Sequence, residues 1–426
     1  MKKNQWILFL IVFGDMMGFS IIFPLFPDTL RHYIKLGNDP IFVWIYSLAE
    51  LLTNEKNSPF LIIFFGGILG SIYSLLQFLF SPIWGRLSDR WGRKPILIFS
   101  SLGSLLGYSI WLFSLSFSGF VFSRIITGAM GGNISVASAS MADMTSAKDR
   151  AKGMGMIGAG IGLGFIFGPF FGGLASGIEI HDLLPNLEFL KFTVFSLSAM
   201  ISVIVALLTL ILVIFVLKET NPKKKSNANF SNFHHPILDS SSLHFRAVLF
   251  VSYIYFLFIF SFSGFEFCLN FFLNEFKGFQ PRDIGLTFLY IGMIIIFVQG
   301  GIVRRISGKV KEVNIILSGA GILMVGYLGM IFFSFHNFGL YLSLGFLSVG
   351  SALIHPGLSS LASLLSKQED QGKNLGIFRS FGSLARAFSP LTFALIYFGY
   401  GPFLVFWSTL GWTVFLGTSL LIWSRK

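Results

Sequence analysis

Long apolar stretches follow one another along almost the whole chain, separated by short polar segments. Each stretch approaches or exceeds the roughly 20 residues that a helix needs to cross the hydrocarbon core of a bilayer. The pattern therefore predicts an all-α, polytopic membrane protein without a sizeable soluble domain. We expect twelve membrane-spanning helices, at residues 6–27, 58–82, 95–117, 119–142, 150–175, 191–217, 245–273, 283–303, 313–334, 337–365, 374–399 and 401–423.

The distribution of basic residues predicts how the chain is oriented. An even number of spans places both termini on one side of the membrane, and the segments on that side carry most of the 31 lysines and arginines. The positive-inside rule therefore predicts cytoplasmic N and C termini. The segments on the other side carry only Arg31, Lys35, Lys56, Lys191, Lys277 and Arg282.

A polar, basic segment between the sixth and seventh spans divides the chain into two halves. We expect a six-helix bundle at residues 1–217, a cytoplasmic linker at 218–244 and a second six-helix bundle at 245–426. A weak repeat supports this division, because the glycines of GRLSDRWGRK, starting at Gly85, and of GIVRRISGK, starting at Gly301, share a seven-residue spacing. Duplicated, pseudo-symmetric halves are typical of transporters whose substrate site lies between them near the bilayer midplane.

Composition excludes several other functions. The net charge of +12 is concentrated beside the spans, which indicates contact with the lipid bilayer surface and no binding of nucleic acid. Cys268 is the single cysteine, so neither an intramolecular disulfide nor a cysteine metal site is expected. The sequence contains no GxxxxGK[ST] and no HExxH pattern. We therefore expect no enzyme activity, metal or cofactor, and a carrier driven by an ion gradient.

The loop after the second span has a specific pattern of glycines and charges. Read alone, GRLSDRWGRK is compatible with an ordinary basic cytoplasmic loop. However, it matches GxLxDRxGRK throughout and resembles the signature loop of the major facilitator superfamily, which implies a conformational latch made by Asp89 and Arg93. The residues at the matching positions of this latch are Gly85, Asp89, Arg90, Gly92, Arg93 and Lys94.

The fifth span is unusually rich in glycine. Gly160, Gly164, Gly168 and Gly172 recur every four residues, so they line one side of a helix that Pro169 bends, as in a generic packing seam. The full pattern Gx8Gx3GPx2GG resembles the one associated with antiporters, including tetracycline and multidrug exporters. The resemblance implies that this span packs tightly against a partner in the other half. Its matching residues are Gly155, Gly164, Gly168, Pro169, Gly172 and Gly173.

Two charged residues lie inside spans of the first half. Asp15 belongs to FGDMMGFSIIFPLFP, which resembles the opening helix of the same exporters. We interpret Asp15 as a proton-coupling or substrate-facing residue, the alternative being a structural hydrogen-bonding carboxylate. Arg124 opens RIITGAMGGN, which resembles the fourth-helix motif of the superfamily, implying an electrostatic role in proton transfer. Asp15 is its expected partner, and a purely structural ion pair is the alternative.

The second half carries three further charged residues inside its spans. Glu266 is a candidate for protonation or cation contact, or alternatively a residue of an outer gate. Arg379 and Arg386 lie seven residues apart on one face of the eleventh span. They indicate an anionic group on the substrate, or pairing with Glu266 and Asp15, and Arg379 could also extend to the membrane surface. This half also resembles, more weakly, the tetracycline-transporter-like organic-anion carriers of animals.

The remaining polar residues within spans either line the pathway or hydrogen-bond between helices. They are Gln77, Asn133, Asn270, Gln299 and His355. The loop at 28–57 contains IFVWIYSLAELL, which predicts a short amphipathic helix on the membrane surface or over the outer mouth.

Together these features predict a secondary active transporter that exports small amphipathic compounds or drugs in exchange for protons by alternating access. The first alternative is proton-linked uptake or flipping of an organic anion or lipid-like solute. The second is a receptor or scaffold that does not transport. We expect a monomer in a bacterial inner membrane, whose partners are a small-molecule substrate, protons and the lipid bilayer.

Overall fold

The computed structural model describes residues 3–37, 39–53, 59–145, 150–180, 185, 192–220, 243–306, 308–366 and 371–425, so most of the predicted linker lies outside the described residues. The chain is all-α, and eleven helical stretches are long and apolar enough to cross a membrane. The helices are α1 (Lys3–Ser20), η1 (Phe23–Leu25), α2 (Phe26–Leu36), α3 (Pro40–Thr53), α4 (Pro59–Trp91), α5 (Arg93–Phe113), α6 (Phe117–Met130), α7 (Asn133–Met144), α8 (Arg150–Ala175), α10 (Ser196–Phe215), α11 (Leu243–Glu275), α12 (Pro281–Phe297), η4 (Val298–Val303), α13 (Arg304–Ile306), α14 (Glu312–Phe333), α15 (Asn337–Leu365), α16 (Gln371–Tyr400) and α17 (Pro402–Ser424).

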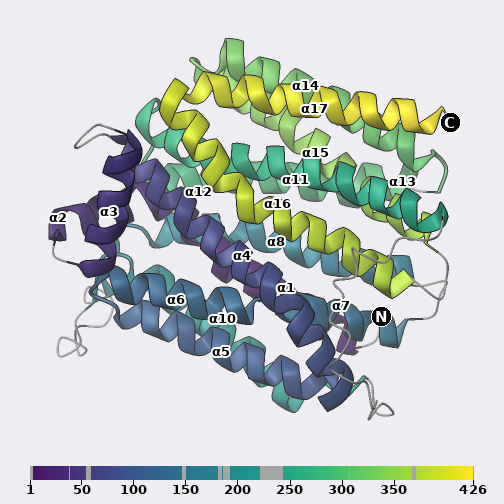
Figure 1. Cartoon of the computed structure of the whole chain (residues 1–426), viewed down its shortest axis with the longest axis horizontal. Helices are drawn as coiled ribbons and strands as arrows, with labels where there is room; N and C mark the ends of the chain where they lie inside the picture. The colour runs from purple at the N-terminus through teal and green to yellow at the C-terminus, as the bar shows by residue number, and fades with distance from the viewer. Residues whose placement is uncertain are drawn as a thin grey trace.

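The long helices run side by side between two faces of the molecule (Figure 1). Both termini lie at one of these faces, which we call the terminal face, and α2 and α3 lie at the other, the opposite face. Helices α5, α6 and α10 pack at one edge, and α14, α15 and α17 pack at the other. Helices α4, α8, α12 and α16 join the two groups, because α4 contacts α16 and α8 contacts α12.

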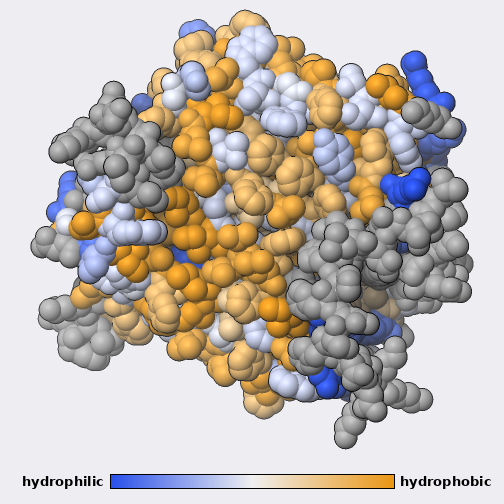
Figure 2. All heavy atoms as spheres, in the orientation of Figure 1, coloured by the Kyte–Doolittle hydropathy of each residue, from blue (hydrophilic) through white to orange (hydrophobic). Residues whose placement is uncertain are grey.

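A belt of apolar side chains covers the surface between the two faces. Figure 2 shows hydrophobic residues across the middle of the visible surface, with the most hydrophilic residues near its edges. Large side chains such as Phe99, Phe215 and Phe297 are exposed on the helices of this belt. Hydrocarbon is the only solvent in which such a surface is stable, so the chain is a multi-pass membrane protein.

The predicted fourth span, 119–142, is two shorter helices, α6 and α7, which meet at Gly131 and Gly132. Helix α4 packs directly against this junction, since a Cβ added at Gly132 would lie 3.0 Å from the backbone nitrogen of Ser81. Side chains of α4 also satisfy carbonyl groups at the break: Trp84 donates to Ala129 at 2.7 Å, and Gln77 donates to Gly131 at 3.0 Å. Such outside partners make an interrupted helix tolerable inside a membrane.

The glycine row of α8 packs against α1, which belongs to the same half of the chain. A Cβ added at Gly164 or Gly168 would lie 2.7 Å from the carbonyl oxygen of Phe13 or Met17, respectively. The Ser20 hydroxyl also donates to the Gly164 carbonyl at 3.1 Å. Most of the row thus faces α1, while the expected packing of this span against the other half is made with α12 and involves Gly173 of the same motif. The i, i+4 spacing defines a smooth face without identifying its partner.

The two groups of helices meet backbone to backbone near the opposite face. A Cβ added at Gly173 of α8 would lie 2.8 Å from the Cα of Gly285 in α12. Similarly, a Cβ at Gly67 of α4 would lie 3.0 Å from the Cβ of Ala394 in α16. These two approaches, which we call the opposite-face seal, close the space between the groups at this end.

The predicted helix in the loop 28–57 is present as α3, docked on the end of α6 at the opposite face. Asp39 caps both helices, because its carboxylate accepts from the backbone of Ile41 and Phe42 in α3 and from the backbone and hydroxyl of Ser118 in α6. These four hydrogen bonds span 2.6 to 3.1 Å. The Trp44 side chain points away from this contact and is 68% exposed.

Candidate functional site

A cavity of about 370 Å³ lies between the two groups of helices, on the terminal side of the seal. Helices α4, α7 and α8 form one wall, and α11 and α16 form the other. We call this space the central cavity. Its polar lining includes Gln77, Asp89, Arg93, Asp143, Tyr255, Arg379 and Arg386.

Arg379 and Arg386 line this cavity without a carboxylate partner. Arg379 donates to the backbone carbonyl of Met154 in α8 at 3.2 Å, which joins the two groups of helices. Arg386 is buried and makes a single long hydrogen bond, at 3.4 Å, to Ser383 on its own helix. Among the described residues, no carboxylate lies within 4.0 Å of either guanidinium group. Both cations are therefore available to an anionic ligand.

A second cavity of about 100 Å³ adjoins the first and is lined mainly by apolar side chains. We call it the deep cavity. Glu266, Gln299 and His355 line it, and Arg386 lies on the walls of both cavities. Arg386 attracts the Glu266 carboxylate electrostatically, although the two do not form a close ion pair. Glu266, Gln299 and His355, which were predicted as site residues of the second half, therefore share this cavity with Arg386. Asn270 does not line it, and its side-chain amide donates to carbonyl groups of its own helix.

Asp15 and Arg124 are buried together in the first half but do not form the expected ion pair. The Arg124 side chain is only 2% exposed, and none of its guanidinium nitrogens has a hydrogen-bond acceptor among the described residues. Its charge instead lies over aromatic rings, 4.6 Å from the centre of Trp111 and 5.4 Å from that of Phe120. The faces of these rings attract the cation. They take the role that the sequence analysis had assigned to the carboxylate of Asp15.

Asp15 faces a different neighbour. Its carboxyl group is close to the side chain of Asn133, which is fully buried at the start of α7. Neither Asp15 nor Asn133 lines the central or the deep cavity. Gln77 differs from them, because it lines the central cavity while donating to Gly131. Of these three predicted residues, Gln77 therefore reaches the central cavity, whereas Asp15 and Asn133 are buried away from it.

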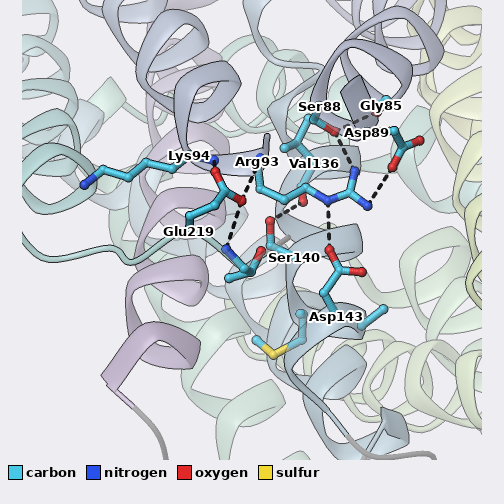
Figure 3. A network of polar contacts seen from close by, with 12 residues as sticks. Gly85, Ser88, Asp89, Arg93, Lys94, Val136, Ser140, Asp143 and Glu219 are labelled. Atoms are coloured by element: carbon cyan, nitrogen blue, oxygen red, sulfur yellow. Dashed lines mark hydrogen bonds and ion pairs between the residues drawn. The ribbon is translucent and has the colours of Figure 1, made fainter. Parts of the chain in front are cut away.

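The signature loop forms a compact ionic network around Arg93 (Figure 3). The Arg93 guanidinium contacts Asp89 at 2.8 Å, Asp143 at 2.9 Å and the Ser88 hydroxyl at 2.6 Å. Asp89, Arg93 and Asp143 also line the central cavity. Their contacts join α4, α5 and α7 of one half, and the role of Asp89 and Arg93 as a conformational latch stays a prediction.

Two acidic residues of this network were missed in the sequence. Asp143 lies at the end of α7, and Glu219 follows α10. The Glu219 carboxylate accepts from the backbone nitrogens of Arg93 and Lys94 at 3.0 Å each, which caps the N-terminus of α5. Gly92 makes this approach possible, because its φ is +99° and a Cβ would lie 2.6 Å from the carboxylate. The signal available in the sequence was that Glu219 is a single acidic residue in an otherwise basic segment.

The second copy of the loop repeats the turn but not the network. Gly308 has φ +76°, like its counterpart Gly92. However, Arg305 and Lys309 occupy the positions equivalent to Asp89 and Arg93. Among the described residues, ion pairs of this loop are therefore found in the first copy and not in the second.

The comparisons with known proteins agree with this architecture. A model of the Major Facilitator Superfamily matches residues 8–390. Major facilitator superfamily domain-containing protein 10 of the mouse is 30% identical and covers 99% of this chain and 92% of its own length. The class B tetracycline resistance protein of Escherichia coli is 27% identical, covering 93% of this chain and 89% of its own.

Solved structures have the same arrangement of helices. The crystal structure of the human organic anion transporter MFSD10 (TETRAN) matches with a TM-score of 0.80 and 26% identity, over 98% of both chains. A bacterial homologue of the human lysosomal transporter Spinster shares the fold, with a TM-score of 0.69 and 11% identity, over 100% of this chain and 98% of the other. The chain therefore belongs to the Major Facilitator Superfamily of membrane transporters.

Proposed function

We propose that this protein is a secondary active transporter that carries small amphipathic organic anions by alternating access. The observation that carries the proposal is the pair of arginines, Arg379 and Arg386, on the wall of the central cavity without a carboxylate partner among the described residues. A buried cation without a partner is costly, and an anionic substrate would remove that cost. The human structural neighbour is described as an organic anion transporter, which supports the same class.

We further propose the orientation and conformation of this state. The positive-inside rule makes the terminal face cytoplasmic. The central cavity extends to that face at Asp89 and Gly376, whereas the opposite-face seal closes the other end. The described state is then one that receives substrate from the cytoplasm. Relatives come from mammals and from bacteria, so the proposed orientation does not depend on a bacterial inner membrane. One chain encloses the whole cavity, which supports a monomer.

Glu266 is the proposed link to protons. It lines the deep cavity together with Arg386 and is attracted by it, so a substrate anion and the Glu266 carboxylate compete for one cation. Protonation of Glu266 removes the competitor, and anion binding in turn favours protonation. Proton and anion would therefore bind together and move in the same direction.

Proton-coupled antiport of uncharged or cationic drugs is the second candidate. Two observations favour it, namely the buried Asp15 and the α8 glycine pattern shared with antiporters. In this scheme a proton entering from outside neutralises Asp15 and returns the empty carrier. Two tetracycline resistance proteins are among the relatives that match more than 90% of the chain.

Flux measurements in proteoliposomes separate the two candidates. Anionic, zwitterionic and cationic compounds are added to vesicles of defined orientation while an internal dye reports pH. We expect anion-dependent proton movement with the anion, and a loss of about tenfold or more in Arg386→Gln, because a charge-assisted hydrogen bond contributes roughly 1.5–3 kcal/mol. Arg305→Gln, in the terminal-face loop, is the matched control.

Variants of Glu266 and Asp15 test which carboxylate couples proton movement to transport. Glu266→Gln should abolish proton movement while Asp15→Asn retains it. Proton movement opposite to a cationic compound, lost in Asp15→Asn, would contradict the proposal and support the antiporter. Absence of flux for every compound would favour a receptor or scaffold.

A further inference from the structure

A hydrogen-bonded pair of side chains connects the wall of the central cavity to the wall of the deep cavity. Tyr255 of α11 lines the central cavity, and His355 of α15 lines the deep cavity. The Tyr255 hydroxyl and the His355 Nε2 atom lie 3.1 Å apart and form a hydrogen bond. Ile161 and Arg386 line both cavities, so they lie at the boundary between them.

The position of Tyr255 is defined by its neighbours on α16. Its ring stacks on Phe378, with the ring centres 4.0 Å apart. The ring also lies against Gly382, where any Cβ would overlap it. The stacking on Phe378 and the hydrogen bond to His355 hold the ring in place.

The deep cavity has the chemistry of a site for an apolar group. Its walls include the side chains of Phe165, Ile166, Phe258, Phe262, Phe288 and Ile291. Two of its lining residues are glycines of α8, Gly158 and Gly162, and a Cβ added at either would have no atom within 4 Å. The space therefore exists partly because these two positions lack side chains.

We propose that the deep cavity is a subsite for the apolar portion of the transported anion, with Arg386 at its mouth holding the anionic group and the Tyr255–His355 pair closing it. This inference rests on the proposed function, because it assumes that Arg386 binds an anion. The ligand is then a monoanion with an apolar chain or ring attached directly to its anionic group. Apolar pockets with a few placed polar groups are the usual form of such sites.

A series of straight-chain carboxylates from acetate to octanoate tests the subsite, using the full chain in proteoliposomes or detergent. While the chain still fits, wild-type affinity should rise by about fourfold per methylene, since each buried methylene contributes roughly 0.8 kcal/mol. In Gly158→Leu and Gly162→Leu, the added side chain fills the cavity. We expect about tenfold weaker binding of octanoate or more, with acetate binding little changed.

Three further variants serve as a control, a counterpart and a test of the Tyr255–His355 pair. Gly321→Leu adds the same side chain at an exposed glycine of α14 whose Cβ would have no atom within 4 Å, and it should behave as wild type. Phe262→Leu enlarges the deep cavity, so the optimal chain should become longer. Tyr255→Phe keeps the stacked ring and removes the hydrogen bond to His355, and it should speed the exchange of long carboxylates more than that of acetate.

The outcomes separate the inference from the function on which it rests. If wild type binds no carboxylate, the proposed function fails and the subsite with it. If carboxylates bind but affinity does not depend on chain length, or the glycine variants weaken acetate and octanoate equally, the anion site stands and the subsite is overturned. A shift of the optimum in opposite directions for Gly158→Leu and Phe262→Leu supports it.

Discussion

At the scale of single residues, the structure holds its buried arginines in two different ways. Arg93 is surrounded by Asp89, Asp143 and Ser88, whereas Arg124 lies over aromatic rings. The sequence identified both residues and suggested Asp89 and Asp15 as their respective partners. Only the first contact is present, because Asp89 and Arg93 flank the short turn at Gly92 between α4 and α5. A partner on a helix distant in sequence depends on packing that local spacing does not determine.

Replacing Arg93 should destabilise the protein measurably. Arg93→Ala leaves Asp143 and Ser88 without their shared donor, so we expect the free energy of unfolding to fall by about 1–3 kcal/mol. This range allows for Asp89, whose side chain is 55% exposed and contributes little. Thermal unfolding in detergent measures the effect. Lys309→Ala, at the equivalent position of the second loop, should change stability by less than about 0.5 kcal/mol, and an equal loss there would contradict this account.

Asp39 makes the docking of α3 sensitive to acid. Burial alone would raise the pKa of Asp39, but hydrogen bonds from Ser118, Phe42 and Ile41 hold it below its ordinary value. A lowered pKa means that the carboxylate stabilises the docked helix above about pH 4. This contribution is lost as the pH falls through the lowered pKa. The hydrogen-exchange protection factors of residues 40–53, which are corrected for the intrinsic pH dependence of exchange, should therefore fall in strong acid.

Two variants separate the two caps that Asp39 provides. Asp39→Ala removes both, at about 1 kcal/mol for each helix, and should accelerate exchange in α3 at neutral pH. Ser118→Ala removes only the side-chain bond to α6 and leaves the cap of α3 intact. It should loosen docking less, and an effect equal to that of Asp39→Ala would show that the α3 cap contributes nothing.

At the scale of helices, the lengths of the apolar stretches were enough to predict most of the spans. The differences between the predicted and the observed helices have physical causes. The fourth span is broken at Gly131 because side chains of α4 take over the hydrogen bonding there. Helix α4 runs to Trp91, beyond the predicted end at residue 82, because polar residues continue a helix that projects past the apolar belt. The glycine row of α8 was recognised, but its partner was not, because every glycine face offers the same smooth surface.

The contact between α1 and α8 should tolerate no added methyl group. In Gly168→Ala, the new Cβ would lie 2.7 Å from the carbonyl oxygen of Met17, so the helices must separate, at about 1–3 kcal/mol. Gly155→Ala is the matched control on the same helix, since its Cβ would have no atom within 4 Å. Higher helix propensity should leave that variant as stable as wild type or slightly more so. Melting temperatures that fall equally in both would contradict the packing argument.

At the scale of the whole molecule, the opposite-face seal and the central cavity define one conformation of a transport cycle. The sequence predicted two halves, but it contained no information on which end of the space between them is closed. That choice depends on the relative position of the helices, to which Gly67, Gly173 and Gly285 contribute by allowing close approach in this state.

A disulfide across the seal should arrest transport. Gly67→Cys with Ala394→Cys, in a Cys268→Ser background, places two thiols on Cβ atoms about 3.0 Å apart, close enough for a bond after a small adjustment. Oxidation should stop flux while Gly376→Cys, added on the central cavity wall, stays reactive to thiol reagents from the terminal side. Reduction should restore flux. Transport that continues with the bond formed would show that the seal does not open.

The arginines also make the carrier responsive to membrane voltage. Arg124, Arg379 and Arg386 outnumber Asp15 and Glu266 among the charged residues that the sequence places deep inside the predicted spans, so we expect the empty carrier to keep net positive charge there through any rearrangement. Moving one charge fully across the membrane changes the free energy by about 2.3 kcal/mol per 100 mV. A bound monoanion cancels one such charge. Imposed potassium diffusion potentials should therefore alter net flux, which requires the empty carrier to return, more strongly than one-for-one anion exchange, which does not.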